Sequence, residues 1–407
     1  MDLGYLKDKP IAVLGAGGVG KPIAADSALA GAKVRIWDQE DFAKTTLKNI
    51  ERGIDIEGEQ LSYFNFRRNG RGFVELASTD MADVVKGAGI VCIATVALAH
   101  EKLFRQLIPL LEDGQVIHII PDNYGTLLLR KMMREAGCTK KVIIGGWCTS
   151  PYGARVRIDG GVTMNRVNVV NRCTVLRGAA LPDTDTEVFL ESAQYLPAFD
   201  AVLTGHGFVA ADTVLDTNFS NANPVIHVPA AVLGAAVMQN FESVLGHKLQ
   251  DYGFYAHALC PAMAEVMAEF WEEEKRIVAA LGVGICHVAY EEFFSRSSMY
   301  GHEYMGPDYK VPFEAFSTKS IGGGPFSLET RFLTEDVPVG CYVYQQLARR
   351  HGIETPTIDS MVHLANVMLK RDLIAKNGYT LDYLGIGHMD NNQLHAWLRE
   401  GVYTEIS

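Results

Sequence analysis

Near the start of the chain, three glycines have the spacing of a ligand-binding turn. Gly15, Gly17 and Gly20 follow the short apolar run 11–14 in G-x-G-x-x-G spacing. In this spacing the first glycine allows a tight turn, the second lets a pyrophosphate approach the backbone, and the third lets the next helix pack closely on the strand. The free N–H groups and the positive dipole end of that helix suit a diphosphate.

An acidic residue after the second predicted strand could bind the ribose of the same ligand. Asp38 ends the second predicted strand, 33–37, where a carboxylate accepts hydrogen bonds from an adenosine ribose and repels a 2′-phosphate. Strand, glycines, helix, strand and acid together are far more specific than the glycines alone. The sequence therefore predicts a nicotinamide dinucleotide site that prefers NAD(H) to NADP(H). The expected cofactor-binding residues are Gly15, Gly17, Gly18, Val19, Gly20, Asp38, and Thr95 and Val96 at the carboxyl end of the strand 89–94.

A second polar group lies in the later half of the chain. Segment 220–229 places His227 near Asn221 and Asn223, and segment 329–338 supplies a cation and acids, including Arg331 and Asp336. A histidine oriented by a carboxylate is a general acid/base, and a nearby arginine can hold a substrate carboxylate. A hydrogen-bonded core histidine is the alternative, and the residue types alone leave both open.

Two other features have a structural interpretation. His118 alternates within the apolar strand 115–120, which indicates a core histidine rather than a catalyst. The basic cluster 67–71 is more typical of an exposed hairpin turn than of a phosphate site.

Alternating strands and helices must position the glycine turn. The pattern predicts a helix over 18–31 and a turn, 121–126, at the carboxyl end of the strand 115–120. Two antiparallel strands, near 155–159 and 162–170, and a third strand at 172–178 are expected to extend the sheet. A helix follows over 181–195, and a strand over 199–203.

The later half looks helical. Helices are expected over 229–245, over 261–281 with Gly282 as its stop, and over 340–351 and 357–370. The glycine-rich stretch 299–324 is typical of an excursion that covers a site. The predicted fold class is α/β: an N-terminal Rossmann dinucleotide-binding domain, 1–205, followed by an all-helical C-terminal domain, 206–407.

Composition excludes several classes of protein. The 407 residues carry a formal net charge of −11, which argues against a nucleic-acid partner. No apolar run is long enough to span a bilayer, and the N-terminus has no apolar signal core. Seven scattered cysteines without a C-x-x-C pair suit a reducing compartment, so a cytoplasmic protein without a metal site is expected. The sequence does not determine the oligomeric state, and a homodimer is the one assembly considered.

The sequence resembles the opine dehydrogenases of the octopine/nopaline type, which include N-(1-carboxyethyl)-norvaline dehydrogenase. The resemblance rests on the glycine turn with Trp37-Asp38, on Asn-x-Asn-x-x-x-His at 221–227, and on Thr-Arg-Phe-x-x-Glu-Asp-Val at 330–337. It implies a Rossmann domain followed by an all-helical domain, with substrate bound in the cleft between them. The implied reaction is reductive condensation of an amino acid's amine with a 2-keto acid at the expense of NAD(P)H.

The resemblance also implies roles for single residues. His227 resembles the proton-transferring histidine, Asp336 its carboxylate partner, and Arg331 the arginine that holds the keto-acid carboxylate. Asn123, Asn221 and Asn223 are expected to help bind substrate. Two loops depart from the family: the chain has Pro121-Asp122-Asn123 in place of an Asn-Pro-Gly-like turn, and 147–155 lacks the usual Glu-Thr/Ser opening. We interpret the charge of Asp122 as one that could favour a cationic amino acid.

Two rival functions remain. An NAD-dependent 2- or 3-hydroxyacid dehydrogenase of similar two-domain build would reduce a ketone without any amine. A catalytically silent NAD-binding sensor or scaffold would keep the glycine turn and would need neither His227 nor Arg331. If His227 were only structural, the catalyst would be sought among Asp122, Tyr124 and Tyr152.

Overall fold

The computed structural model describes residues 3–58, 60, 66–159, 162–284 and 324–405. Contacts divide them into two compact units. Unit 1 contains the described residues up to Asn218 and those from Asn392 onward, and unit 2 contains those from Phe219 to Asn391. The first compact unit extends past residue 205 and includes the described C-terminal residues. The division into two domains, 1–205 and 206–407, stays a prediction.

An eight-stranded sheet forms the centre of unit 1. Its strands, in spatial order, are β12 (Gly207–Ala210), β11 (Val175–Ala180), β8 (Ile143–Trp147), β7 (Val116–Ile119), β6 (Ile90–Ile93), β1 (Ile11–Leu14), β2 (Val34–Trp37) and β5 (Leu76–Ser78). Neighbouring strands are parallel, except that β11 runs antiparallel to β8. The apolar runs of β1, β6 and β7 are buried throughout, as expected of strands covered on both faces.

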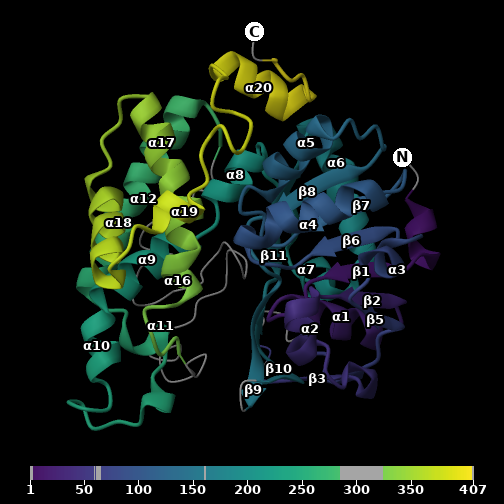
Figure 1. The fold of residues 1–407 in the computed structure, drawn as a ribbon, viewed down its shortest axis with the longest axis horizontal. Coiled ribbons are helices and arrows are strands. Elements are labelled where there is room, and N and C mark those ends of the chain that lie inside the picture. The colour runs from purple at the N-terminus through teal and green to yellow at the C-terminus, as the bar shows by residue number, and fades with distance from the viewer. Residues whose placement is uncertain (1–2, 59, 61–65, 160–161, 285–323, 406–407) are drawn as a thin grey trace. The chain divides into compact units, whose positions relative to one another are not determined.

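Helices alternate with these strands (Figure 1). Those of unit 1 are α1 (Gly20–Leu29), α2 (Glu40–Thr46), α3 (Met81–Val85), α4 (His100–Leu107), α5 (Gly125–Glu135), α6 (Thr186–Ser192), α7 (Asp200–Leu203), α8 (Val214–Phe219) and α20 (Asn391–Glu400). The predicted dinucleotide-binding architecture is confirmed: β1 lies between β2 and β6, and α1 follows β1 directly.

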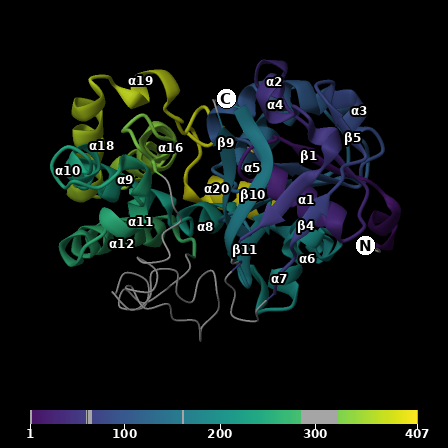
Figure 2. The same cartoon turned by 90° about the horizontal axis from the view of Figure 1, so that it is seen from below.

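A second sheet corrects the sequence-based prediction. Strands β9 (Tyr152–Asp159) and β10 (Val162–Arg172) do not extend the main sheet; they pair with β3 (Ile54–Glu57) and β4 (Gly70–Gly72) in the order β4-β3-β10-β9. Of the three strands expected there, only β11 joins the main sheet. The two long strands of this second sheet run side by side, and β10 packs against α1 and α2 (Figures 1 and 2).

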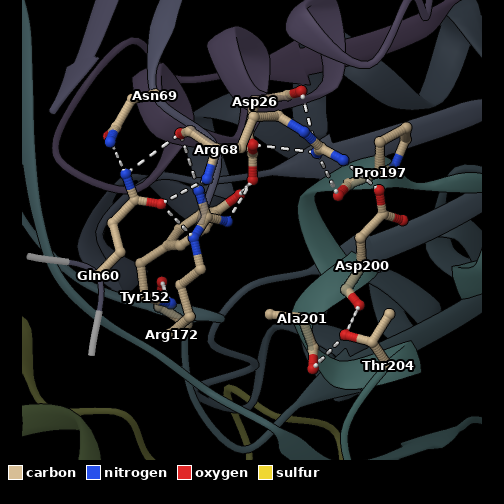
Figure 3. Close-up of polar contacts among 11 residues, drawn as sticks. Asp26, Gln60, Arg68, Asn69, Tyr152, Arg172, Pro197, Asp200, Ala201 and Thr204 are labelled. Carbon is tan, nitrogen blue, oxygen red and sulfur yellow. Dashed lines mark hydrogen bonds and ion pairs between the residues drawn. The ribbon is translucent and has the colours of Figure 1, made fainter. Parts of the chain in front are cut away.

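A buried polar cluster fastens the second sheet to α1 (Figure 3). Asp26 of α1 is fully buried and accepts hydrogen bonds from Arg172 at 2.6 Å, from the Tyr152 hydroxyl at 2.7 Å and from Arg68 at 3.1 Å. Arg68 also pairs with Asp200 at 2.5 Å. The prediction of an exposed hairpin turn is therefore wrong at Arg68. This residue is partly buried, and it links α1 and α7 through ion pairs with Asp26 and Asp200.

Unit 2 is helical over its described residues, apart from one isolated bridge between Gly253 and Gly324. Its helices are α9 (Asn223–Leu233), α10 (Ala235–Asn240), α11 (Phe254–His257), α12 (Pro261–Leu281), α16 (Arg331–Thr334), the π-helix η9 (Asp336–Cys341), α17 (Tyr342–Arg350), α18 (Pro356–Leu369) and α19 (Leu373–Asn377). The prediction for 261–281 is confirmed to the residue, and Gly282 ends that helix in the left-handed region with φ 66°.

Two predicted elements are wrong. Segment 199–203 is the short helix α7, not a strand, because Pro197 opens a helical turn that continues into it. The expected helix 229–245 begins earlier, at Asn223, and breaks after Leu233 into α9 and α10. Most of the predicted excursion 299–324 lies outside the described residues. No helix in the described part of the chain is long and apolar enough to cross a membrane.

Candidate active site

The glycine turn has the geometry that its spacing predicts. Gly15 takes φ 109°, and its backbone lies so close to the end of β6 that a Cβ would come within 2.7 Å of the Ala94 carbonyl oxygen. A Cβ on Gly20 would lie 1.7 Å from the Gly15 carbonyl oxygen. A Cβ on Gly17 or Gly18 would meet no atom within 4 Å. Two glycines thus allow close packing, and two leave open space before the first turn of α1.

Asp38 is joined directly to this turn. One carboxylate oxygen accepts from the Ala16 N–H at 3.3 Å, and the other accepts from the Gln39 N–H at 2.8 Å. The Gly15 N–H donates to the Trp37 carbonyl at 2.8 Å, so the glycine turn and the end of β2 form one unit. Asp38 is 8% exposed, which leaves a small accessible surface beside the turn. This is the place where an adenosine ribose is held in such folds.

The end of β6 adds two predicted residues on the ligand edge of the sheet. The Thr95 hydroxyl is buried, and no hydrogen-bond partner for it lies among the described residues. Val96 is 43% exposed although it is apolar. A buried hydroxyl of this kind is costly unless a ligand meets it. The open glycines, Asp38 and this hydroxyl are groups that suit a dinucleotide, and their contacts with one remain a prediction.

The turn after β7 is strained and heavily supported. Asn123 and Tyr124 both have positive φ, 42° and 60°, which non-glycine residues adopt at a cost. Asp122 accepts from the Thr126 N–H at 2.9 Å, and Asn218 donates to Asp122 at 2.6 Å and accepts from the Tyr124 N–H at 2.6 Å. Burial raises the pKa of Asp122 to about 6, against these hydrogen bonds.

This network overturns the interpretation of Asp122 as a recognition charge. Asp122 is 1% exposed, and its carboxyl group already accepts the hydrogen bonds that hold the turn. Asn123, the predicted substrate residue, is carried at this turn and is only partly buried.

The predicted histidine and acid come together in unit 2. His227 on α9 and Asp336 in η9 are 109 positions apart in the sequence, yet Nδ1 and Oδ2 lie 2.8 Å apart. Gly340 of η9 approaches α9 so closely that a Cβ would lie 2.7 Å from the Pro224 ring, so a glycine here allows the contact. Burial raises the pKa of Asp336 to about 7, and the charge of Arg331 opposes that rise.

Two further side chains complete this group. Phe332 stacks on the His227 ring, with centroids 3.7 Å apart and planes 18° apart, and it fixes the plane of the imidazole. Arg331, the residue before it, is exposed at the start of α16 and close enough to influence Asp336 electrostatically. Thr330 caps α16 by accepting from the Phe332 N–H. One short helix therefore presents both the aromatic support and the cation.

The two predicted asparagines begin α9. Asn221 is 5% exposed and its side-chain oxygen accepts from the Asn223 N–H at 3.1 Å, so this oxygen helps to start the helix. Asn223 is partly buried at the first position of α9, one turn before His227. Their predicted contact with substrate remains a prediction.

The structural interpretation of His118 is confirmed. Its ring is fully buried between the Ser192 hydroxyl at 3.0 Å and the Trp147 indole N–H at 3.2 Å, and burial lowers its pKa to about 3. The Tyr152 hydroxyl likewise donates to Asp26, and burial raises the pKa of that phenol far above its ordinary value. Neither group is suited to proton transfer near neutral pH.

Sequence reasoning missed three supporting residues. Lys21 is fully buried in the first turn of α1, Asn218 braces the turn after β7, and Phe332 stacks on His227. The sequence shows a lysine directly after the third glycine, but its full burial, which is rare for lysine, is seen only in the structure. Asn218 carried no signal, since its partners are about 95 positions away.

Comparisons with known proteins agree with this arrangement. Residues 210–369 match the family model for the alpha-helical domain of NAD/NADP octopine/nopaline dehydrogenases. An opine dehydrogenase from Arthrobacter sp. (strain 1C) is 27% identical over 388 residues, 94% of this chain and 96% of that protein.

Two solved structures share the fold. Octopine dehydrogenase with NADH and pyruvate has a TM-score of 0.64 at 18% identity, covering 94% of this chain and 99% of that one. Yersinopine dehydrogenase with bound NADP+ has a TM-score of 0.62 at 15% identity, covering 97% and 98%. The resemblance predicted from the motifs is thereby confirmed: residues 210–369 match the octopine/nopaline dehydrogenase family model, and nearly the whole chain is similar to an opine dehydrogenase.

Proposed function

We propose that this protein is an NADH-dependent opine dehydrogenase. It joins the amine of an L-amino acid to a 2-keto acid such as pyruvate, reduces the resulting imine to an N-(carboxyalkyl)amino acid, and catalyses the reverse oxidation. The observation that carries the proposal is the His227–Asp336 pair beside Arg331, in the unit whose sequence matches the helical domain of the family. An NAD-linked oxidoreductase acting on a CH–NH bond is the corresponding enzyme class.

Separate residues bind the substrates and transfer the proton in this proposal. Arg331 holds the keto-acid carboxylate, since a guanidinium matches a carboxylate in charge and geometry. Asn123, Asn221 and Asn223 help to orient the substrates. His227 exchanges protons with the carbinolamine as water leaves, through Nε2, while Asp336 on Nδ1 fixes the ring and stabilises its charged form. When bound, the nicotinamide cofactor supplies the hydride.

The cofactor part of the proposal rests on the glycine turn. Gly15, Gly17, Gly18, Val19 and Gly20 hold the phosphates, Asp38 holds the adenosine ribose, and Thr95 and Val96 meet the cofactor at the end of β6. Asp38 favours NADH, because its charge repels the 2′-phosphate of NADPH. A cytoplasmic location is also proposed, from the dispersed cysteines of the sequence.

A matrix of amino acids against pyruvate, glyoxylate and 2-oxoglutarate, followed by NADH consumption, tests the reaction. We expect little turnover with a keto acid alone and rapid turnover once the right amine is added. Fast oxidation of NADH by a keto acid without amine would establish the hydroxyacid dehydrogenase instead. The product should contain a secondary amine, which mass spectrometry identifies directly.

A further inference from the structure

A buried lysine stands in the first turn of the dinucleotide helix. Lys21 follows Gly20 directly, and its side chain is fully buried. Its N–H donates to the Gly17 carbonyl at 3.1 Å, so its backbone belongs to the same turn that carries the open glycines. The mechanism proposed above does not use this residue.

The position is unfavourable for a positive charge. The N-terminal end of a helix carries partial positive charge, which repels an ammonium. Burial adds a second cost, because the charged form loses its hydration. Burial lowers the pKa of Lys21 to about 8, and the negative charge of Asp38 counteracts this. A lysine placed here is stabilised by negative charge nearby, either from Asp38 or from an anion that binds at the turn.

The second sheet holds the amine in place. Lys21 Nζ donates to the Asn165 side-chain oxygen at 2.9 Å and to the Met164 carbonyl at 3.2 Å, both on β10. Asn165 in turn donates to the Lys48 carbonyl, just beyond α2, at 2.9 Å. The hairpin β9–β10 thus reaches the start of α1 and the segment after α2, on the side of the sheet where Asp38 ends β2.

We propose that the fixed ammonium of Lys21 acts at a distance on the dinucleotide: it attracts the phosphates and offsets Asp38, so that it limits the discrimination against NADPH. This inference rests on the proposed dinucleotide function. Lys21 acts through its charge rather than by contact, because its amine is enclosed by β10. A 2′-phosphate brings additional negative charge beside Asp38, so NADPH gains more from the ammonium than NADH does.

The experiment compares Lys21→Met with Asn165→Ala. The first removes the charge with little change of volume, and the second removes the shorter of the two hydrogen bonds between the amine and β10 and keeps the charge. Dissociation constants for NADH and NADPH are measured by cofactor fluorescence without any substrate. We expect Lys21→Met to weaken NADH about fivefold and NADPH about thirtyfold, and Asn165→Ala to leave the ratio of the two within about twofold of wild type. Equal ratios in both variants would overturn the proposal, since a merely structural bridge predicts them.

Variants at Asp38 provide a second measurement. Asp38→Asn should improve NADPH binding about tenfold, and most of this gain should disappear in Asp38→Asn/Lys21→Met. Lys21→Arg keeps the positive charge and serves as the test if Lys21→Met folds poorly. Its ratio of NADPH to NADH dissociation constants should be close to that of wild type. An unchanged gain in the double variant would refute the role of Lys21. Because no substrate is present, these results are separate from the outcome of the amine-dependence test.

Discussion

The glycine turn of unit 1 and the histidine pair of unit 2 are built on opposite principles. The turn uses backbone groups and empty space, and all of its parts except Thr95 and Val96 come from 28 consecutive positions, 11–38. The pair uses two side chains from positions 109 apart, which a π-helix and a close helix–helix contact bring to 2.8 Å. Binding by backbone can therefore be predicted from local spacing, whereas a catalytic pair depends on long-range packing.

The largest expected effect tests the pair itself. His227→Ala should lower kcat/KM by roughly two to four orders of magnitude, the usual contribution of a general acid/base. NADH affinity should stay within about twofold, because the cofactor elements belong to the other unit. Steady-state rates and NADH fluorescence separate the two quantities. His363→Ala, at an exposed position of α18, is the matched control. Near-normal turnover in His227→Ala would make the pair a structural contact.

Asp336→Asn is expected to have a smaller effect and a distinct pH signature. The amide keeps the geometry and loses the charge, so kcat/KM should fall roughly tenfold to a hundredfold, less than the loss of the base itself. The pKa of Asp336 is raised to about 7 by burial, so the group is a carboxylate above pH 7 and neutral below it. Wild-type activity should decline as pH falls through about 7, relative to Asp336→Asn under the same conditions.

The double variant tests whether the two residues act as one unit. His227→Ala/Asp336→Asn should be little slower than His227→Ala alone, because groups that act together are not additive. Multiplied losses in the double variant would show that Asp336 works independently of the histidine. Equal pH profiles for wild type and Asp336→Asn would assign the transition near pH 7 to another group, including the substrate amine.

Elements with local sequence signals were predicted, whereas local signals did not predict contacts between distant positions. The glycine turn, Asp38, the strands β1, β2, β6 and β7, and the helix α12 all have local signals, namely glycine spacing, apolar runs and end-capping residues. Two strands of the second sheet, β9 and β10, were predicted, but their pairing with β3 and β4 lacked a local signal, because β3 pairs in parallel with β10 about 110 positions away. The same applies to Asp26, whose partners Tyr152 and Arg172 are 126 and 146 positions distant.

In one segment, a local signal for a strand was outweighed by the preceding helical turn. The apolar segment 199–203 suits a strand by composition, yet the turn opened by Pro197 makes it a helix. His227 was ambiguous on its own, and only the resemblance to a family gave it a role. The geometry shows the contact with Asp336 that the resemblance implied, and it adds the stacking on Phe332, which no sequence signal indicated.

Gly20→Ala tests the packed half of the glycine turn. Its Cβ would lie 1.7 Å from the Gly15 carbonyl oxygen, so the first turn of α1 must move away from β1. Overpacking of this kind costs about 1–3 kcal/mol. We expect a lower melting temperature and NADH binding weaker by about tenfold, measured by thermal unfolding and fluorescence. Unchanged binding would mean that the close approach of α1 is not needed for the cofactor.

Gly17→Ala tests the open half of the same turn, and its effect should be the smallest. A Cβ here meets nothing within 4 Å in the free protein, and φ at Gly17 is not in the left-handed region, so the melting temperature should not fall. The methyl group would occupy space that a pyrophosphate needs, and NADH binding should weaken about fivefold. Loss of affinity without loss of stability is the result that only a ligand-facing glycine predicts. If Gly17→Ala lost stability and affinity together, as Gly20→Ala should, both glycines would serve packing, and the distinction between the two halves of the turn would fail.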